Sequence, residues 1–243
     1  MHEEIFKVRY YEVDATGNLP LWTLQNYFQE AAGRDAHGFA FGAEDLAHTG
    51  TAWAMTRMYF KFSKAVKNVK NIKVKTWHHL AEKIQSRRDF IMFDETGAEI
   101  CKGITWWILL DLQKRKITRI PQNLIDMNPA NPPAVTEDAQ MKAPDFSGQP
   151  PLNSHEIIVR LEDIDSNKHV NNVHYSAWAL AGVPQDIYNS KSLEDVFINF
   201  KNEALQGDRI TAKTYEQGGN AYWHILTRET DGKEIASIYT TWR

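Results

Sequence analysis

Two stretches of this chain repeat the same order of residues, and this internal duplication constrains the fold more than any single motif. Val8-Arg9 is matched by Val159-Arg160, and Asp14 is matched by Asp165 before a helix-like apolar stretch. Later matches keep this order: Ile72, Lys75 and Thr76 with Ile210, Lys213 and Thr214, then Gly97, Glu99, Ile100, Thr105 and Trp107 with Gly232, Glu234, Ile235, Thr240 and Trp242. A repeat of roughly a hundred residues is too long for a solenoid, so the chain is predicted to hold two copies of one unit.

Each copy has the same predicted elements: a short strand, one amphipathic helix and then several strands. Residues 71–77 alternate between apolar and polar side chains, and residues 209–213 do so more weakly. Residues 94–97 and 229–232 are predicted hairpin turns, in which glycine supplies the positive φ angle. One helix against a curved antiparallel sheet, made twice, is an α+β architecture.

Prolines gather between the two copies. Seven of the nine prolines lie in residues 121–154. Such a segment resists regular structure, because proline fixes φ and lacks a backbone donor, so it is predicted to be a connector over the surface. We therefore predict an N-terminal domain at 1–122, a connector at 123–154 and a C-terminal domain at 155–243.

Composition favours a soluble protein of a reducing compartment. A chain of 243 residues that is 42% hydrophobic can bury one substantial core or two fused ones. Its net charge of −3 argues against nucleic acid as the main partner. The single cysteine, Cys101, cannot form a disulfide within the chain and reads as a buried small hydrophobe in a strand. Because no apolar run could span a membrane and no leader is visible, a cytoplasmic location without a membrane partner is predicted.

The segment from Asp165 to Asn172 concentrates groups that handle protons or polarise a carbonyl. Asp165, Asn167, His169 and Asn172 lie just before an apolar, helix-like run. Backbone N–H groups at a helix N-terminus favour negative charge, such as the oxyanion of acyl transfer. Asp or Asn before a helix is usually only a cap, but a cap does not need His169. The segment therefore indicates a catalytic site.

This motif and several other segments together resemble a known family. Asp-Xaa-Asn-Xaa-His-Val-Asn-Asn is close to the motif of hotdog thioesterases in general, including 4-hydroxybenzoyl-CoA thioesterase. The chain as a whole is similar to bacterial acyl-acyl carrier protein (acyl-ACP) thioesterases, which are akin to the plant plastid enzymes that end fatty-acid synthesis. The segments that carry this resemblance are Phe6–Glu12, Trp53–Met58, Arg87–Asp89, Leu112–Pro121 and Asp163–Trp178. The resemblance implies two tandem hotdog domains, each a curved antiparallel sheet wrapped around one long helix.

The resemblance also implies the site residues. Asp165, Asn167 and His169 match three catalytic positions of the family, and Glu203 matches a fourth, acidic position. Some plant members carry a cysteine after that acid, once proposed as the nucleophile. Here the residue is Ala204, which excludes a cysteine mechanism for this chain. Without the resemblance, Glu203 would be taken for an exposed surface charge.

The duplication supports the same site independently. The first copy replaces three of the four catalytic residues: Thr16 stands for Asn167, Asn18 for His169 and, from the match of Phe60-Lys61 with Phe200-Lys201, Ser63 for Glu203. Only the aspartate is kept, as Asp14. Groups needed for the fold should occur in both copies, whereas groups needed for chemistry can remain in one. The chemistry is therefore assigned to the second copy.

The resemblance implies thioester hydrolysis without a metal or cofactor. The backbone N–H groups of Val170, Asn171 and Asn172, at the helix start, are expected to bind the substrate carbonyl and hold the oxyanion. One such donor is typically worth about 3 kcal/mol of transition-state stabilisation.

The roles of the four side chains remain open at this point. Asp165 or Glu203 would activate water as general base, or Asp165 would attack directly to give a mixed anhydride. His169 is expected to orient a carboxylate or the substrate. Asn167 is expected to hold Glu203 or the water.

The first copy is implied to enclose the acyl chain, and the partner is implied to be an acyl carrier protein. Trp53, Met55 and Arg57 are the substrate-binding candidates, although ordinary core is the more common role for such residues. Because the carrier is acidic, a basic docking face is expected. Its candidates are Lys61, Lys64, Lys67, Lys70, Lys73 and Lys75, or Lys114, Arg115, Lys116 and Arg119, with a solvated strand face as the alternative for each. A homodimer is compatible with this prediction.

Two rival functions are weighed against this one. An acyl-CoA thioesterase of the same superfamily would share the site and differ in its recognition of the carrier. A non-enzymatic acyl-binding sensor, as in some transcriptional regulators, would need a DNA-binding module that the sequence does not supply. A sensor would also have no reason to keep the four catalytic residues together.

Overall fold

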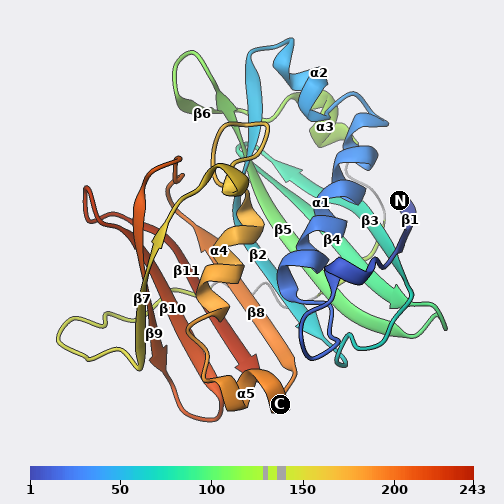
Figure 1. Cartoon of the computed structure of the whole chain (residues 1–243). Helices are drawn as coiled ribbons and strands as arrows, with labels where there is room; N and C mark the ends of the chain where they lie inside the picture. Colours follow the sequence, from blue (N-terminus) through green and yellow to red (C-terminus); the bar gives the residue numbers. More distant parts are fainter. Residues whose placement is uncertain (128–130, 136–140) are drawn as a thin grey trace. The chain divides into compact units, whose positions relative to one another are not determined.

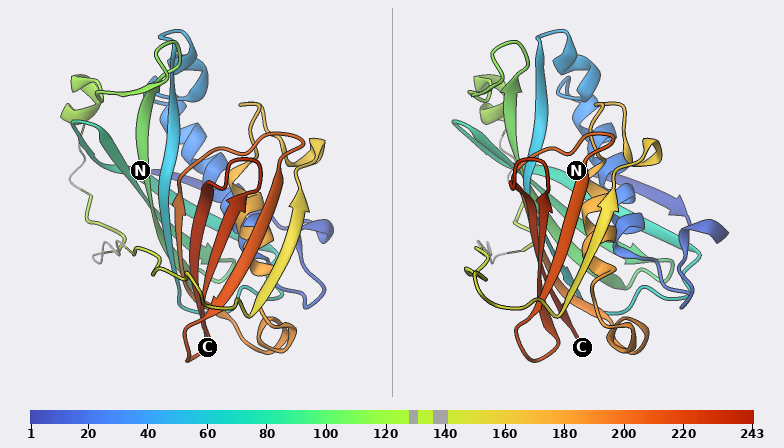
Figure 2. Two further views of the ribbon diagram at one scale, coloured as in Figure 1. Left: turned by 90° about the vertical axis from the view of Figure 1, so that its left-hand side faces the viewer. Right: turned by 60° about the vertical axis from the view of Figure 1, so that its left-hand side comes forward.

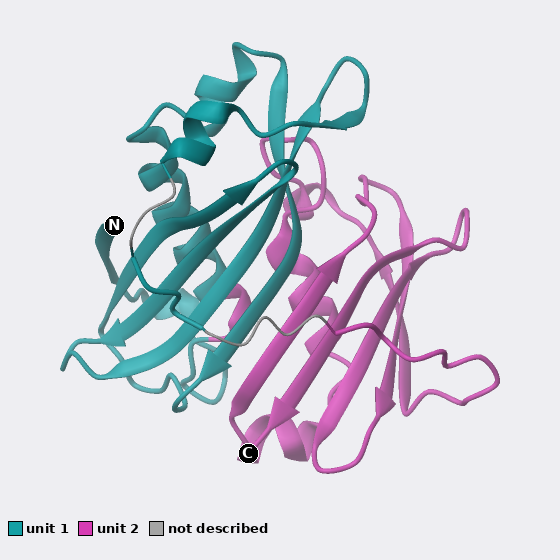
Figure 3. Cartoon of the chain, turned by 180° about the vertical axis from the view of Figure 1, so that it is seen from behind, with its two compact units in different colours: residues 1–19, 24–138 teal, residues 20–23, 139–243 magenta. Residues whose placement is uncertain are grey.

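The computed structural model describes residues 1–127, 131–135 and 141–243, and the chain divides into two compact units (Figures 1 and 3). Unit 1 comprises residues 1–19 and 24–138, and unit 2 comprises residues 20–23 and 139–243. The division at residue 138 falls inside the predicted connector.

Unit 1 is an antiparallel sheet with one long helix on its face (Figure 2). Its elements are β1 (His2–Lys7), the 3-10 turn η1 (Tyr10–Glu12), α1 (Leu21–His37), α2 (Ala43–Ala47), β2 (Thr51–Phe62), β3 (Asn71–Glu82), β4 (Gln85–Asp94), β5 (Glu99–Asp111), β6 (Lys116–Thr118) and α3 (Gln122–Asp126). The strand order is β1-β3-β4-β5-β2, and β6 pairs with β5. Phe28 of α1 stacks on Phe60 and contacts Phe90, so the core lies between helix and sheet.

Unit 2 repeats this sheet and helix, with one further α-helix among the described residues where unit 1 has two, α2 and α3. Its elements are β7 (Asn153–Ile158), η2 (Leu161–Asp163), α4 (Asn172–Leu180), α5 (Gln185–Ser190), β8 (Leu193–Phe200), β9 (Arg209–Glu216), β10 (Ala221–Arg228) and β11 (Glu234–Trp242). The strand order, β7-β9-β10-β11-β8, is the unit 1 order with each strand replaced by its counterpart. The predicted α+β architecture, made twice, is confirmed.

The local signals in the sequence are also found where they were predicted. Gly97 and Gly232 adopt positive φ angles of 83° and 65° in the two hairpin turns.

The helix α4 ends at Leu180, and the chain then passes close to β9. A Cβ atom at Gly182 would lie 2.0 Å from Oγ1 of Thr214, so only glycine fits at this crossing.

Part of the connector is held against unit 1. Arg87 and Asp89 of β4 form a buried ion pair, with Nε and Oδ1 2.7 Å apart. The N–H of Ala134 donates to Oδ2 of Asp89 at 2.7 Å, and Nη2 of Arg87 donates to the carbonyl of Val135 at 2.8 Å. Residues 134 and 135 are therefore fixed by two charge-assisted hydrogen bonds.

Among the described residues, no helix is long and apolar enough to cross a membrane.

Candidate active site

In unit 2, a tight turn that begins at Asp165 leads into the central helix. Oδ1 of Asp165 accepts a hydrogen bond from the N–H of Asn167 at 2.8 Å. The N–H of Lys168 donates to the Asp165 carbonyl at 2.9 Å, and the N–H of Asp165 donates to the His169 carbonyl at 3.0 Å. Lys168 takes a φ of 66°, in the left-handed region that an L side chain rarely adopts. The carboxylate thus shapes the turn by accepting from its own backbone.

Unit 1 contains the same turn at Asp14. Oδ1 of Asp14 accepts from the N–H of Thr16 at 2.9 Å, and Gly17 takes a φ of 78°. The N–H of Gly17 donates to the Asp14 carbonyl at 3.0 Å, and the N–H of Asp14 donates to the Asn18 carbonyl at 2.9 Å. Since both copies use the aspartate in this way, its retention has a structural cause. Asp165 carries that structural role in addition to its predicted chemical one.

The Asp14→Ala variant is expected to lose stability and keep its chemistry. The substitution removes the acceptor of the turn, which should lower the free energy of unfolding by about 1–2 kcal/mol. The value of kcat should stay within about twofold of wild type, because the predicted catalytic positions lie in the other copy. Chemical denaturation and steady-state kinetics measure the two effects. A large fall in kcat at full folding would contradict the assignment of the chemistry to unit 2.

His169 and Glu203 come together in unit 2. Nε2 of His169 lies 3.0 Å from Oε2 of Glu203, and the two side chains are 42% and 45% exposed. The loop before α4 and the loop after β8 are joined beside this pair, because the N–H of Val170 donates to the Ala204 carbonyl at 2.9 Å. The pair is therefore both fixed in position and open to water and substrate.

The equivalence of Glu203 with Ser63 was wrong by two residues. In unit 1 the N–H of Leu19 donates to the Val66 carbonyl at 2.8 Å, as Val170 does to Ala204. The residue before Val66, Ala65, is therefore the counterpart of Glu203. The error arose because Phe60-Lys61 repeats the dipeptide Phe200-Lys201. In the sheet, Phe62, the last residue of β2, is the counterpart of Phe200, the last residue of β8. The conclusion that the first copy lacks the acid is unchanged.

Two of the three expected oxyanion donors are engaged within the protein. Val170 donates to Ala204, and the N–H of Asn171 donates to the Asp163 carbonyl at 2.9 Å. Asn171 is the N-cap of α4. Of these three N–H groups, only that of Asn172, the first residue of α4, has no protein acceptor among the described residues. The predicted oxyanion site therefore narrows to Asn172.

The side chain of Asn167 is directed toward Asp165. Its Nδ2 lies 3.5 Å from Oδ2 of Asp165, and no hydrogen bond to Glu203 is formed in the described structure. The expectation that Asn167 holds Glu203 is therefore not met in this geometry. A role in holding the water stays a prediction.

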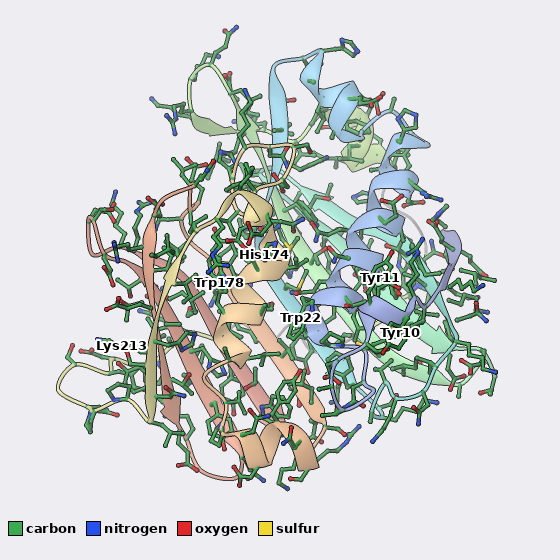
Figure 4. All side chains as sticks on the ribbon, viewed as in Figure 1. Tyr10, Tyr11, Trp22, His174, Trp178 and Lys213 are labelled. Atoms are coloured by element: carbon green, nitrogen blue, oxygen red, sulfur yellow. The ribbon has the colours of Figure 1, made fainter. Side chains whose placement is uncertain are left out.

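The start of α4 is anchored by a contact between His174 and Asp163. Nδ1 of His174 lies 3.2 Å from Oδ1 of Asp163, while Oδ2 of Asp163 accepts from the N–H of Arg160 at 2.8 Å. His174 projects from α4 together with Trp178, one turn later (Figure 4). The helix N-terminus is thereby held against η2.

The predicted substrate-binding residues Trp53, Met55 and Arg57 all lie on β2. Nε1 of Trp53 donates to the Phe41 carbonyl at 3.0 Å, and Met55 is buried. The guanidinium of Arg57 lies over the ring of Trp106, 5.0 Å from its centroid. Each side chain thus has a structural role in unit 1, and their contact with substrate stays a prediction.

The neighbourhood of Glu203 contains two groups that the sequence did not single out. Nη1 of Arg228 donates to the Glu203 carbonyl at 2.9 Å, and the N–H of Ala204 donates to the Tyr175 hydroxyl at 3.1 Å. Burial raises the pKa of Tyr175 to about 12, so the hydroxyl is protonated at neutral pH. A comparison of the two copies could have found Tyr175, because Leu24 stands at its counterpart.

Two α+β units of one topology, with a histidine–glutamate pair at the helix start of the second, define the class of tandem hotdog thioesterases. A model of the acyl-ACP thioesterase N-terminal domain matches residues 1–127, and a model of the C-terminal domain matches residues 150–243. The chain belongs to the acyl-ACP thioesterase family and is a thioester hydrolase.

Named relatives and solved structures agree with this assignment. The chain is 26% identical to the chloroplastic oleoyl-acyl carrier protein thioesterase 1 of Arabidopsis thaliana, over all of this chain and 76% of that protein. It is 26% identical to the palmitoyl-acyl carrier protein thioesterase of Cuphea hookeriana, over 98% of this chain and 61% of that protein.

Among solved structures, the 12:0-ACP thioesterase of Umbellularia californica has a TM-score of 0.87 at 23% identity, over 99% of this chain and 96% of that one. An acyl-ACP thioesterase of Bacteroides thetaiotaomicron has a TM-score of 0.87 at 20% identity, over 99% and 97%. These likenesses confirm the predicted hotdog fold.

Proposed function

We propose that unit 2 hydrolyses the thioester of a fatty acyl-ACP, with Glu203 as the general base. The contact of 3.0 Å between His169 and Glu203 carries this proposal. A carboxylate that accepts from an imidazole is fixed in direction, and its remaining lone pairs can take a proton from water. We prefer Glu203 to Asp165 as base because one oxygen of Asp165 is committed to its own turn.

The reaction follows from these positions. Glu203 takes a proton from water, and the resulting hydroxide attacks the thioester carbon. The carbonyl oxygen becomes an oxyanion beside the N–H of Asn172, where the helix N-terminus favours negative charge. Collapse of this intermediate breaks the carbon–sulfur bond, and Glu203 returns its proton to the departing thiolate. The products are a free fatty acid and the carrier with a free thiol.

The identity of the carrier is tested by matched substrates. We expect kcat/KM for acyl-ACP to fall steeply with ionic strength, because exposed charges that steer an acidic carrier are screened over about 10 Å at 0.1 M salt. Hydrolysis of the acyl-CoA of the same chain length should be slower at low salt. Equal rates on both carriers at every salt concentration would favour a general acyl-CoA thioesterase. Tight acyl binding without hydrolysis of either would favour a sensor.

The basic candidates for docking differ in their availability. Several are already neutralised in part by acids of unit 1: Lys64 by Asp94, Lys75 by Glu3 and Lys114 by Asp111. Among the residues that the structure describes, neither Lys67 nor Lys70, two of the remaining candidates, has a side-chain ion pair. Charge reversal at Lys67 and Lys70 is therefore the first experiment to locate the docking face.

The division of labour between the units predicts a shift in acyl-chain length. If unit 1 encloses the chain, Trp53→Ala or Met55→Ala should change the preferred length and keep activity on some length. Burying one more CH₂ is worth about 0.8 kcal/mol, which re-ranks neighbouring lengths by several-fold. Substitution of His169 or Asn167 should instead depress all lengths by a similar factor. A length profile that moves only with unit 2 variants would contradict this division.

A reducing compartment, the cytoplasm, is part of this proposal. It is supported by the single cysteine, Cys101, which is buried in β5. Cell fractionation tests the location, and light scattering of the purified chain tests whether it forms a homodimer.

A further inference from the structure

Both polar atoms of the peptide bond between Glu203 and Ala204 are held by side chains. Nη1 of Arg228, at the end of β10, donates to the Glu203 carbonyl at 2.9 Å. The Ala204 N–H donates to the Tyr175 hydroxyl at 3.1 Å. The next carbonyl, that of Ala204, accepts from the N–H of Val170 at 2.9 Å. Three elements therefore meet at the backbone that carries the proposed base.

The two side chains that hold this peptide have little freedom. Tyr175 is buried, and its ring lies edge-to-face against Phe200 at 5.6 Å and tilted against Trp178 at 5.6 Å. The guanidinium of Arg228 is bound by both oxygens of Asp231, at 3.0 Å and 2.8 Å. A packed aromatic ring and a bidentate ion pair are stiff supports.

The first copy lacks this arrangement where it also lacks the acid. Leu24 occupies the position of Tyr175 in the helix, counted from the aspartate of each turn. Asp94 occupies the position of Arg228, because Ile72 pairs with Asp94 as Ile210 pairs with Arg228. The hydroxyl and the guanidinium thus occur only in the copy that holds Glu203, although the fold is the same in both.

We infer that Tyr175 and Arg228 are positioning residues that hold the Glu203 carboxylate against His169; this inference rests on the proposed function. They act through the peptide and touch neither the substrate nor the reacting atoms in this mechanism. When the hydroxyl is absent, the buried Ala204 N–H loses its acceptor and the Glu203 backbone is free to shift. A displacement of about 1 Å at a reacting group can reduce the rate by about a hundredfold.

The test is the Tyr175→Phe variant of the full chain, assayed on acyl-ACP. The substitution keeps the ring packing and removes only the hydroxyl. We expect kcat to fall about ten- to a hundredfold and KM to stay within about twofold, because substrate contacts are unchanged. Arg228→Gln should likewise lower kcat and leave KM within about twofold.

A double-mutant cycle separates positioning from general stability. In a Glu203→Ala background, measured by single turnover at high enzyme concentration, Tyr175→Phe should have no further effect on the residual rate. An equal fold-loss in both backgrounds would show that the hydroxyl acts on the fold and not through Glu203, and would overturn the inference.

Two control variants complete the design. Tyr222→Phe removes the hydroxyl of another buried tyrosine of unit 2, and Thr214→Val removes a buried hydrogen bond to His224. Both should leave kcat unchanged when assayed below their melting temperatures. If Tyr175→Phe retains full kcat while Glu203→Ala is inactive, the inference fails and the proposed function stands. If Glu203→Ala retains full activity, the proposed function fails and this inference fails with it.

Discussion

Replacing Glu203 with alanine is expected to reduce kcat/KM for acyl-ACP by at least a hundredfold and up to about ten-thousandfold. This range is the usual contribution of a positioned general base. The side chain is 45% exposed and its removal leaves no cavity in the core, so the melting temperature should stay near that of wild type. Steady-state kinetics and thermal unfolding of the same preparation measure both.

A matched control for this variant is Glu162→Ala, which removes another exposed glutamate of unit 2, one that pairs with Arg160. Its activity should equal that of wild type. Should the loss of activity in Glu203→Ala merely follow the loss of folded protein, Glu203 would have a structural role only.

Asp165 needs a different substitution, because its carboxylate also shapes a turn. Asp165→Asn keeps an oxygen that can accept from the N–H of Asn167, and it removes the negative charge. Asp165→Ala removes both. The difference in stability between the two variants measures how much the carboxylate oxygen stabilises the turn. The activity of Asp165→Asn measures how much the negative charge contributes to the reaction.

Acidification is expected to lower the free energy of unfolding of unit 2 through a buried histidine. His224 is fully buried between two hydroxyls, with Nδ1 3.0 Å from Thr214 and Nε2 3.2 Å from Thr240. Burial lowers the pKa of His224 to about 3, and the nearby His155 acts in the same direction. The folded state therefore keeps this ring neutral at acidities where the unfolded chain binds a proton.

The sign and size of the effect follow from the two pKa values. Above the unfolded pKa, about 6.5, neither state is protonated and His224 does not change stability with pH. Below it, the unfolded state binds one more proton, so the free energy of unfolding falls by about 1.4 kcal/mol per pH unit until the folded pKa is reached. At pH 4.5 the expected loss is about 2.7 kcal/mol.

Chemical denaturation of wild type and His224→Gln at pH 7.5 and pH 4.5 measures this loss. Glutamine does not titrate, so the variant should lose less stability than wild type on acidification. The same slope in both proteins would show that other groups control the acid sensitivity. His78, whose pKa is lowered to about 4 mainly by burial, is the corresponding candidate in unit 1.

The order of elements was predictable because its signals are local. The alternation in residues 71–77 and the glycines of the two hairpins depend on a few neighbouring residues, and the structure places strands and positive φ angles there. The shared aspartate also indicated that one of the four site residues has a structural cause. That this cause is a carboxylate accepting hydrogen bonds from the backbone of its own turn could be seen only in the structure.

The missed features depend on contacts between segments distant in the sequence. Val170 appears in the sequence as an oxyanion donor, but its N–H is used by the Ala204 carbonyl across two loops. The position of Ser63 was displaced by two residues because similarity matched Phe60 with Phe200, whereas strand pairing makes Phe62 the counterpart of Phe200. Tyr175 reads as one more apolar position of a helix until its hydroxyl is seen beside Ala204.

The matching turns at Asp14 and Asp165 have a consequence in evolutionary terms. If the two copies arose by duplication, selection for the fold is expected to keep the aspartate in both, because each carboxylate accepts from the backbone of its turn. Positions 16, 18 and 65 are then free of selection for catalysis. Substitution patterns among relatives should therefore show two regimes within one chain. Asp14 should change as slowly as Asp165, and Ala65 should vary as an ordinary position does. Thr16 and Asn18 should vary only among residues that keep their side-chain hydrogen bonds in the Asp14 turn. A comparison with the first copy thus separates the residues of the site that the fold needs from those that only the reaction needs.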